Sequence, residues 1–380
     1  MCSQRLKIIN FESGVMFFSC VMIIFWIFLF SSFAFAEIRG FWVWQPEPDG
    51  VRFLLPNVKG MNPEILAQRL QKSIKASFRY GKMENAQNLK LSTDPSTFSG
   101  LPRSSSEHPN VAVVLNRPKQ MLSNNPYIST VIQSFECEGV RLFNIPVGLE
   151  MVLSNEDMED FRNQLNRMDG QLGVGGDDPH PLIYGKADTS KTRGDICEVR
   201  DLQQIAYFNA YRKNGLGRVF YICGSMQKAG IGDGFGFHPD IAHLTERPHQ
   251  GNGVPILLEI EVEPDSELAQ AAGSTRFQTS NYHHGAINAH EIPDPKNPPT
   301  SRITAYNIEP SGKKGVIVKA IEFPDHQGIA TQFHPEFRGT DEEKRIIEYI
   351  AMGWKLPARP SSSKIMQCLS RSLSKPFFFK

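Results

Sequence analysis

From Val111 onward the sequence alternates short apolar runs with longer segments of helical spacing, and this alternation limits the possible folds more than any other feature. The runs at residues 111–115 and 218–222 are short and almost continuously apolar, which is typical of strands buried on both faces of a parallel sheet. Strand, helix and strand in succession predict an α/β fold with a doubly wound, mostly parallel sheet flanked by helices.

Further elements follow the same alternation. We expect strands at residues 141–147, 171–174, 255–262, 315–321 and 328–332, and helices at 156–167, 198–213 and from Met226 onward. In a doubly wound sheet the ligand site lies at the carboxyl ends of the strands, where the loops emerge. Candidate functional residues are therefore sought directly after the expected strands.

The first 36 residues have the features of an export signal. Arg5 and Lys7 precede an apolar run over residues 15–33, and Ala34 and Ala36 provide the small residues that signal peptidase requires. We expect cleavage after Ala36 and a periplasmic or secreted protein. A retained anchor is the alternative, because about 20 apolar residues can span a bilayer. Contact with the membrane is expected only in that case.

The rest of the chain divides into three parts by composition. Residues 37–110 are expected to form an N-terminal extension and linker, with a helix at 63–75 and a stretch rich in Ser, Pro and Gly at 93–110. The main domain is expected at 111–356. Residues 357–380 form a basic tail that ends in three phenylalanines and a lysine, and we expect it to be disordered.

Charge and cysteine content exclude several classes of protein. The 41 basic and 40 acidic residues nearly cancel, which argues against a nucleic-acid partner. Outside the export segment, Cys137, Cys197, Cys223 and Cys368 show neither the spacing of a disulfide framework nor that of a zinc site. A single disulfide between Cys137 and Cys197 stays open. No metal or organic cofactor is expected.

Cys223 is the candidate nucleophile. It directly follows the strand expected at 218–222 and precedes the helix expected from Met226, so it should occupy a sharp turn. There its thiol is exposed, and the N–H groups at the start of the helix can stabilise a thiolate. An inert core cysteine is the alternative interpretation of this position alone.

Two other segments provide a candidate base and candidate oxyanion donors for a nucleophilic thiol. His334 and Glu336 lie two residues apart on an extended stretch, so their side chains face the same side and can form a hydrogen bond. A histidine held by a carboxylate is a typical base for a thiol. Gly175 and Gly176 follow a strand, and their backbone N–H groups can approach a reacting carbonyl as an oxyanion hole does.

In this order the motifs resemble those of the class I glutamine amidotransferase superfamily. They resemble most its γ-glutamyl hydrolase branch, peptidase C26, which includes γ-glutamyl-γ-aminobutyrate hydrolases. The family's Asp-Gly to Tyr-Gly segment is followed at 169–185, its cysteine elbow in part at 223–227, and its double histidine at 280–284. Gln-Phe-His-Pro-Glu is unchanged at 332–336. An Arg-Asp-x-x-Glu helix start is approximated by Arg193, Asp195 and Glu198.

The resemblance covers residues 111–340 and implies a flavodoxin-like class I glutamine amidotransferase fold. It implies hydrolysis of a small γ-glutamyl amide or peptide through a thioester, with no cofactor. The residues it assigns are a triad of Cys223, His334 and Glu336, oxyanion donors at Gly176 and Gly224, and substrate contacts at Asp177, Gln227, His283 and His284. The oligomeric state stays open, with a homodimer among the possibilities.

Four positions depart from the family pattern. Tyr221 and Ser225 stand where the elbow prefers glycine, Gly285 replaces a glutamine, and Lys319 stands where an acidic residue is common. We expect Tyr221 to crowd the tight turn and strain its geometry. An inactive binding or interaction protein on the same fold is therefore the alternative function. A peptidase of longer chains and an amidotransferase serving a synthetase are further alternatives, and export argues against the last.

Overall fold

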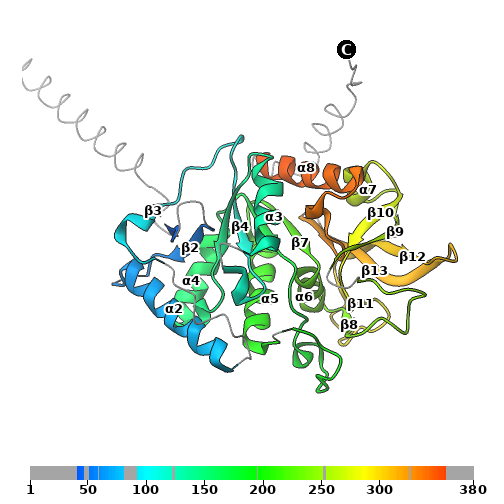
Figure 1. The fold of residues 1–380 in the computed structure, drawn as a ribbon, viewed down its shortest axis with the longest axis horizontal. Coiled ribbons are helices and arrows are strands. Elements are labelled where there is room, and N and C mark those ends of the chain that lie inside the picture. Colours follow the sequence, from blue (N-terminus) through cyan, green and yellow to red (C-terminus); the bar gives the residue numbers. More distant parts are fainter. Residues whose placement is uncertain are drawn as a thin grey trace, which may run out of the picture. The chain divides into compact units, whose positions relative to one another are not determined.

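The computed structural model describes residues 41–46, 51–58, 60–80, 92–121, 125–194, 196–250, 254–324 and 327–356. The expected export signal and C-terminal tail therefore lie outside the described residues. The described residues from Trp42 onward form one compact unit, and Figure 1 labels most of their elements.

The α-helices are α2 (Pro63–Tyr80), α3 (Pro126–Glu136), α4 (Asn155–Leu165), α5 (Glu198–Asn214), α6 (Gly224–Asp233), α7 (Glu267–Ala272) and α8 (Asp341–Lys355). The strands are β1 (Phe41–Trp44), β2 (Phe53–Pro56), β3 (Phe98–Gly100), β4 (Asn110–Val114), β5 (Arg141–Ile145), β6 (Gly170–Gly173), β7 (Arg218–Ile222), β8 (Gly236–His238), β9 (Ile256–Val262), β10 (Arg276–Asn281), β11 (Ala286–Asn288), β12 (Arg302–Ile308), β13 (Lys314–Phe323) and β14 (Gly328–Thr331).

One sheet of twelve strands runs through the molecule in the order β10-β9-β12-β13-β14-β7-β6-β4-β5-β2-β1-β3. The strands from β14 to β2 pair in parallel. They are buried on both faces, as in β4, where all five residues are buried, because crossover helices cover both faces of a parallel sheet. The predicted doubly wound α/β fold is confirmed by this part of the sheet.

Helices cover both faces of the parallel strands. The chain crosses from β4 through α3 to β5 in one direction, and from β5 through α4 to β6 in the other. Right-handed crossovers in opposite directions place α3 and α4 on opposite faces. Helices α3 and α8 contact each other and the sheet, whereas α4, α5 and α6 pack in a row (Figure 1).

An antiparallel extension begins at β13 and was only partly predicted. β13 pairs antiparallel with β14 and β12, and β9 pairs antiparallel with β12 and β10. β10 and β12 were missed because their sequences mix polar and apolar residues, with arginine, glutamine, threonine and asparagine between the apolar positions. Several of these polar residues are buried, among them Thr279, Asn281 and Asn307, so the two strands lack the continuous apolar runs on which the prediction relied.

Strands β1, β2 and β3, which lie in the extension expected at residues 37–110, extend the same sheet at its other end. β2 pairs in parallel with β5, and β1 pairs antiparallel with β3. The fully buried Trp44 packs against Phe53 and Phe98. Helix α2 begins at Pro63 as predicted and is longer than expected at its C-terminal end.

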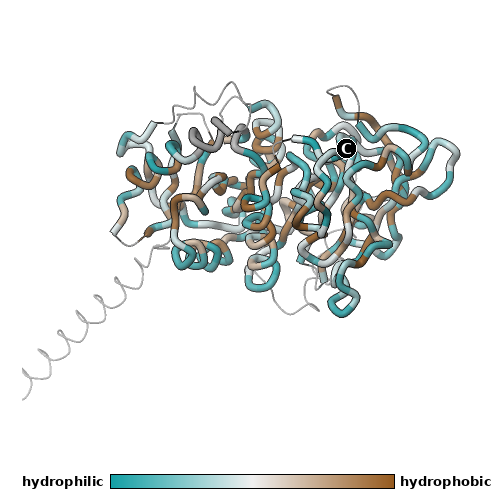
Figure 2. The backbone as a smooth tube through the Cα atoms, turned by 90° about the horizontal axis from the view of Figure 1, so that it is seen from below, coloured by the Kyte–Doolittle hydropathy of each residue, from teal (hydrophilic) through white to brown (hydrophobic). Residues whose placement is uncertain are grey.

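Hydropathy follows this architecture. Figure 2 shows hydrophobic segments concentrated in the central strands and hydrophilic segments on outer helices and loops. Within the residues that the structure describes, no helix is both long enough and apolar enough to cross a membrane.

Tyr221 does not crowd the elbow, so that expectation was wrong. It is the fourth residue of β7 and is fully buried, with its ring packed on Phe208 and Phe323. Its hydroxyl donates a hydrogen bond of 2.7 Å to Gln171 Oε1 on the neighbouring strand β6. The side chain points into the core because residues alternate faces along a strand, and the turn begins only two residues later.

Replacing Tyr221 by phenylalanine tests this account. Tyr221→Phe leaves Gln171 Oε1 buried without its donor, so we expect a loss of about 1–3 kcal/mol in the free energy of unfolding. Urea unfolding followed by circular dichroism measures it. Tyr349→Phe is the matched control, because the Tyr349 hydroxyl makes only a 3.5 Å exposed contact with Gln270. Equal stability of both variants would contradict the assigned role of Tyr221.

Candidate active site

The backbone at Cys223 has a conformation that residues other than glycine rarely adopt. Cys223 joins β7 to α6 with φ of 51° and ψ of −111°. Its N–H donates to Thr331 O at 2.7 Å, and its carbonyl accepts from Gln227 N at 3.0 Å. These two hydrogen bonds fix the strained turn between strand and helix, as expected for a nucleophile elbow.

Gly173 makes room for both departures from the family elbow. A Cβ atom on Gly173 would lie 2.7 Å from Ser225 Cβ and 2.9 Å from Tyr221 Cδ1. Since Gly173 has none, Tyr221 and Ser225 fit beside β6. Ser225 Oγ also donates to Val174 O at 2.6 Å. The sequence departures are therefore compensated on the neighbouring strand.

His334 and Glu336 form the predicted hydrogen bond. His334 Nδ1 lies 2.7 Å from Glu336 Oε1, and both side chains are buried. The His334 backbone N–H donates to Ser280 O at 2.8 Å, which fixes the loop after β14 against β10. Burial opposes charge on the imidazole, but the negative charges of Glu336 and the Cys223 thiolate outweigh it and raise the pKa of His334 well above its usual value.

Gly175 allows His334 and Cys223 to lie side by side. A Cβ atom on Gly175 would lie 3.0 Å from His334 Cε1 and 3.2 Å from Cys223 Cβ. The Gly175 N–H donates to the Tyr127 hydroxyl at 2.8 Å, and the Tyr127 ring meets the His334 ring edge-on at 5.9 Å. Sequence reasoning missed Tyr127, because it comes from α3, far from every motif.

Gly176 and Gly224 present adjacent backbone N–H groups beside Cys223. A Cβ atom on Gly224 would lie 3.2 Å from Gly176 N. Within the described part of the chain, neither N–H donates to an acceptor. A Cβ atom on Gly176 would lie 2.5 Å from Asn116 Cβ, so only glycine fits there. The geometry leaves two donors available for an anionic oxygen.

Buried charged and polar side chains fix the position of Asn116, which packs against Gly176. Asn116 Oδ1 accepts from Lys228 Nζ at 2.8 Å. Lys228 is fully buried, forms an ion pair with Asp201 at 2.9 Å, and donates to Gln204 Oε1 at 2.8 Å. The three donors of an ammonium are thus matched by three acceptors.

The Arg-Asp motif was placed incorrectly along the sequence. Of the residues proposed for it, Arg193 is exposed and Asp195 lies outside the described residues. Arg200 and Asp201 are both buried in α5, and this adjacent pair was the signal that sequence reasoning overlooked. Arg200 Nη1 lies 3.7 Å from Asp177 Oδ2, so α5 also reaches the site.

Gln332 contacts the thiol directly. Its Nε2 lies 3.6 Å from Cys223 Sγ. Gln227 Nε2 donates to Gln332 Oε1 at 3.2 Å and to Gly285 O at 3.0 Å. Gln227 lines the cavity as predicted, but its amide is occupied in positioning Gln332.

A cavity of about 400 Å³ opens above Cys223 and His334. Asp177, His283 and His284, for which the resemblance implies substrate contacts, line it together with Asp178. Asp177 is paired with Arg117 at 3.2 Å, and Asp178 Oδ2 lies 2.9 Å from His284 Nε2. The wall thus carries one ion pair and one contact between a histidine and a carboxylate.

His283 belongs to a buried cluster behind the cavity wall. Its Nδ1 lies 2.9 Å from Gly285 O, and its Nε2 lies 2.8 Å from Lys319 Nζ. His249 Nδ1 lies 3.1 Å from the same ammonium nitrogen. Burial, with the nearby Lys319 charge, lowers the pKa of His283 well below its usual value and that of His249 to about 2.

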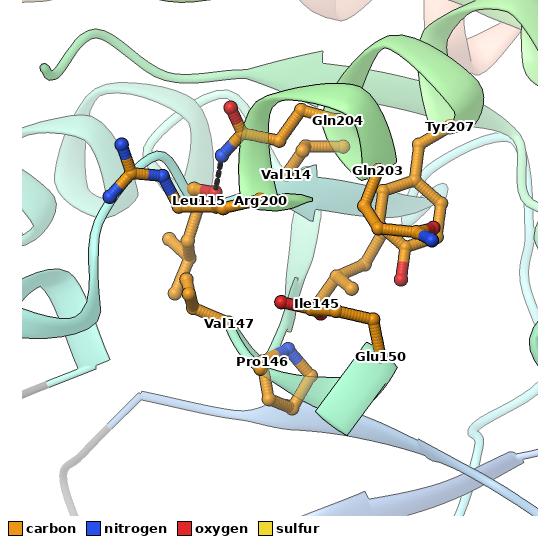
Figure 3. A pocket seen from close by; sticks show the side chains of 11 residues that line it. Val114, Leu115, Ile145, Pro146, Val147, Glu150, Arg200, Gln203, Gln204 and Tyr207 are labelled. Carbon is orange, nitrogen blue, oxygen red and sulfur yellow. Dashed lines mark hydrogen bonds between the residues drawn. The ribbon is translucent and has the colours of Figure 1, made fainter. Parts of the chain in front are cut away.

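A second hollow lies at the carboxyl ends of β4 and β5. Its volume is about 10 Å³, which suits roughly one water molecule. Figure 3 shows Glu150, Gln203 and Tyr207 around it, with Gln204 donating to Leu115 O. It is too small for an organic substrate.

In the described part of the chain, the cysteine, histidine and carboxylate side chains do not cluster into a metal site. Among the residues that the structure describes, no group of three or more His, Cys, Asp or Glu side chains is placed to hold a metal ion. Cys137 and Cys197 are exposed free thiols, so the disulfide that the sequence left open is not formed.

The family model for peptidase C26 matches residues 115–336, which span the elbow, the glycine pair and the His-Glu pair. This chain belongs to the peptidase C26 family. A glutamine amidotransferase-like protein of Lactococcus lactis, YvdE, is 23% identical over 250 residues, which cover 63% of this chain and 97% of that protein. Membership of peptidase C26 supports a hydrolase-type activity.

Two solved structures are similar to this chain at lower sequence identity. The glutaminase domain of CTPS from Trypanosoma brucei has a TM-score of 0.47 and 18% identity, covering 67% of this chain and 96% of that one. A GMP synthase subunit from Thermoplasma acidophilum has a TM-score of 0.43 and 13% identity, covering 69% of this chain and 98% of that one.

The buried neutral histidines of this peptidase C26 protein predict a loss of stability in acid. His249 and His283 have lowered pKa values in the folded state, so below about pH 6.5 the unfolded state binds protons that the folded state does not. Each should cost about 1.4 kcal/mol of unfolding free energy per pH unit below that point.

Urea unfolding at pH 6.5 and 5.5 measures the loss. We expect His249→Gln to reduce the difference between the two pH values by about 1 kcal/mol, because one neutral histidine is removed and the unfolded histidine is only half protonated at pH 6.5. The exposed His290 provides the matched control His290→Gln, for which no change is expected. An unchanged difference in His249→Gln would show that His249 is charged in the folded protein.

Proposed function

We propose that this protein is an exported cysteine hydrolase that cleaves small γ-glutamyl amides or peptides through a thioester. One observation carries the proposal. A strained, cavity-facing Cys223 lies beside His334, whose Nδ1 is hydrogen-bonded to Glu336. A thiol, a base and a carboxylate that orients the base form the arrangement that nucleophilic acyl transfer needs.

In the proposed reaction, His334 takes the thiol proton and Cys223 Sγ attacks the γ-carbonyl carbon. The N–H groups of Gly176 and Gly224 stabilise the negative charge that forms on the carbonyl oxygen. Collapse of this intermediate breaks the carbon–nitrogen bond, and His334 gives its proton to the leaving amine. Water, deprotonated by His334, then attacks the thioester and releases glutamate and the thiol.

The cavity supports a small substrate. Its volume of about 400 Å³ suits a γ-glutamyl group with a short leaving group. We assign Asp177 to the α-amino group, with His283 and His284 in the wall and Gln227 holding Gln332. A peptidase of long chains is the weaker proposal, because such substrates need an extended groove.

Export is proposed from the sequence of residues 1–36 alone. The alternative of an inactive binding protein depended on Tyr221 and Ser225, and both are accommodated beside Gly173.

Turnover of γ-glutamyl anilides and amides tests the proposal. We expect release of the amine by the wild type. Cys223→Ala should lower kcat by about 1,000-fold or more, and Glu336→Gln by a smaller factor, because the base loses only its orienting partner. Cys137→Ser, which removes an exposed thiol, should have no effect. Folded wild-type protein that releases no amine from any γ-glutamyl amide would refute the proposal.

Gly176→Ala tests the oxyanion hole. The new Cβ atom would meet Asn116 and displace the Gly176 N–H. We expect kcat to fall by about 100- to 1,000-fold with little change in KM, because the lost donor acts mainly in the transition state. Gly100→Ala is the control, since nothing lies within 4 Å of its added atom. A proportional rise in KM with unchanged kcat would contradict this role.

A further inference from the structure

Lys319 is a fully buried lysine close to the nucleophile. Its carbonyl accepts from Gln332 N at 2.8 Å, so Lys319 and Gln332 lie opposite each other on adjacent strands. Side chains opposite each other across an antiparallel pair share one face. The Gln332 side chain on that face reaches Cys223 Sγ at 3.6 Å. The Lys319 side chain therefore lies on the same face of the sheet as the side chain that contacts the thiol.

Three neutral groups surround Lys319 Nζ. They are Asn281 Oδ1 at 2.6 Å, His283 Nε2 at 2.8 Å and His249 Nδ1 at 3.1 Å. Asn281 Nδ2 donates to Thr279 O, which orients its oxygen toward the lysine. His283 Nδ1 faces Gly285 O and so carries the ring proton, which makes Nε2 an acceptor.

The number of protons on Lys319 Nζ depends on whether His249 Nδ1 accepts or donates a hydrogen bond. If His249 Nδ1 accepts, Lys319 is an ammonium with three donors and three acceptors. If His249 Nδ1 donates, Lys319 is a neutral amine. Both forms fit the same heavy-atom positions, so the charge of Lys319 responds to the groups around it.

Charged groups near Lys319 act on its pKa in both directions. Burial lowers the pKa of Lys319 well below its usual value, and Arg247 acts in the same direction. The Cys223 thiolate opposes this most strongly, followed by Glu309. Lys228 differs from Lys319 in its partners. It is equally buried but forms an ion pair with the carboxylate of Asp201. Lys319 has no carboxylate among its hydrogen-bond partners in the described part of the chain.

The net charge of the active site indicates a role for Lys319. A thiolate, an imidazolium and the Glu336 carboxylate together carry one net negative charge in a buried site. One ammonium near the thiol cancels it. We propose that Lys319 is a positioning residue for Cys223: its ammonium is the counter-charge of the thiolate, and its hydrogen bond holds His283 in the cavity wall. This inference rests on the proposed function of Cys223 as the nucleophile.

The rate of alkylation of Cys223 by iodoacetamide, followed against pH by mass spectrometry of the Cys223 peptide, tests the proposal. Lys319→Met keeps the length of the side chain and removes its charge. We expect alkylation at pH 6 to fall about tenfold, with rates near those of the wild type at pH 9, where the thiolate forms without help. Lys314→Met, on the same strand but exposed, is the control and should leave the pH profile unchanged.

Asn281→Asp is a second variant in case Lys319→Met does not fold. It keeps the size of the side chain and places a carboxylate beside Lys319. That carboxylate, and not the Cys223 thiolate, then neutralises the lysine charge. Its low-pH rate should fall in the same way. Unchanged pH profiles in the folded variants, or an equal loss at every pH, would overturn the role of Lys319 while leaving the hydrolase proposal intact. A wild-type Cys223 that reacts no faster than the exposed Cys137 would instead refute the hydrolase proposal.

Discussion

The junction between β7 and α6 is the constraint on which the site depends. Cys223 takes a left-handed backbone conformation there, and it is held by the Thr331 carbonyl on one side and the Gln227 N–H on the other. β14 supplies Thr331 and then leads directly to Gln332 and His334. The same pairing of β7 with β14 that fixes the turn therefore brings the base to the thiol.

The site's departures from its family pattern are matched by other residues that make them possible. Gly173 has no side chain, and so Tyr221 and Ser225 fit against β6. Lys319 is buried in a place where acidic residues are common, and Asn281, His249 and His283 provide three neutral partners for it. Tyr221 taken alone suggested a strained elbow, whereas the contacts indicate that neighbouring residues accommodate Tyr221, Ser225 and Lys319.

The sequence predicted the parallel strands and the thiol, imidazole and carboxylate, but not the parts that depend on distant contacts. β4 and β7 were found because continuous apolar runs mark strands buried on both faces. β10 and β12 carry too many polar residues for that signal. Tyr127 was missed because it reaches the site only through the packing of α3, which no local spacing reveals. Asn116 directly follows the strand expected at 111–115 and was overlooked.

The most direct test of the central claim is labelling by an electrophilic glutamine analogue, with the modified residue identified by peptide mass mapping. If Cys223 is a nucleophile activated by His334, the analogue should label Cys223 rapidly and in preference to the exposed Cys137 and Cys197, and His334→Ala should slow that labelling sharply. Labelling of Cys223 that is no faster than at the exposed thiols and indifferent to His334 would contradict the account.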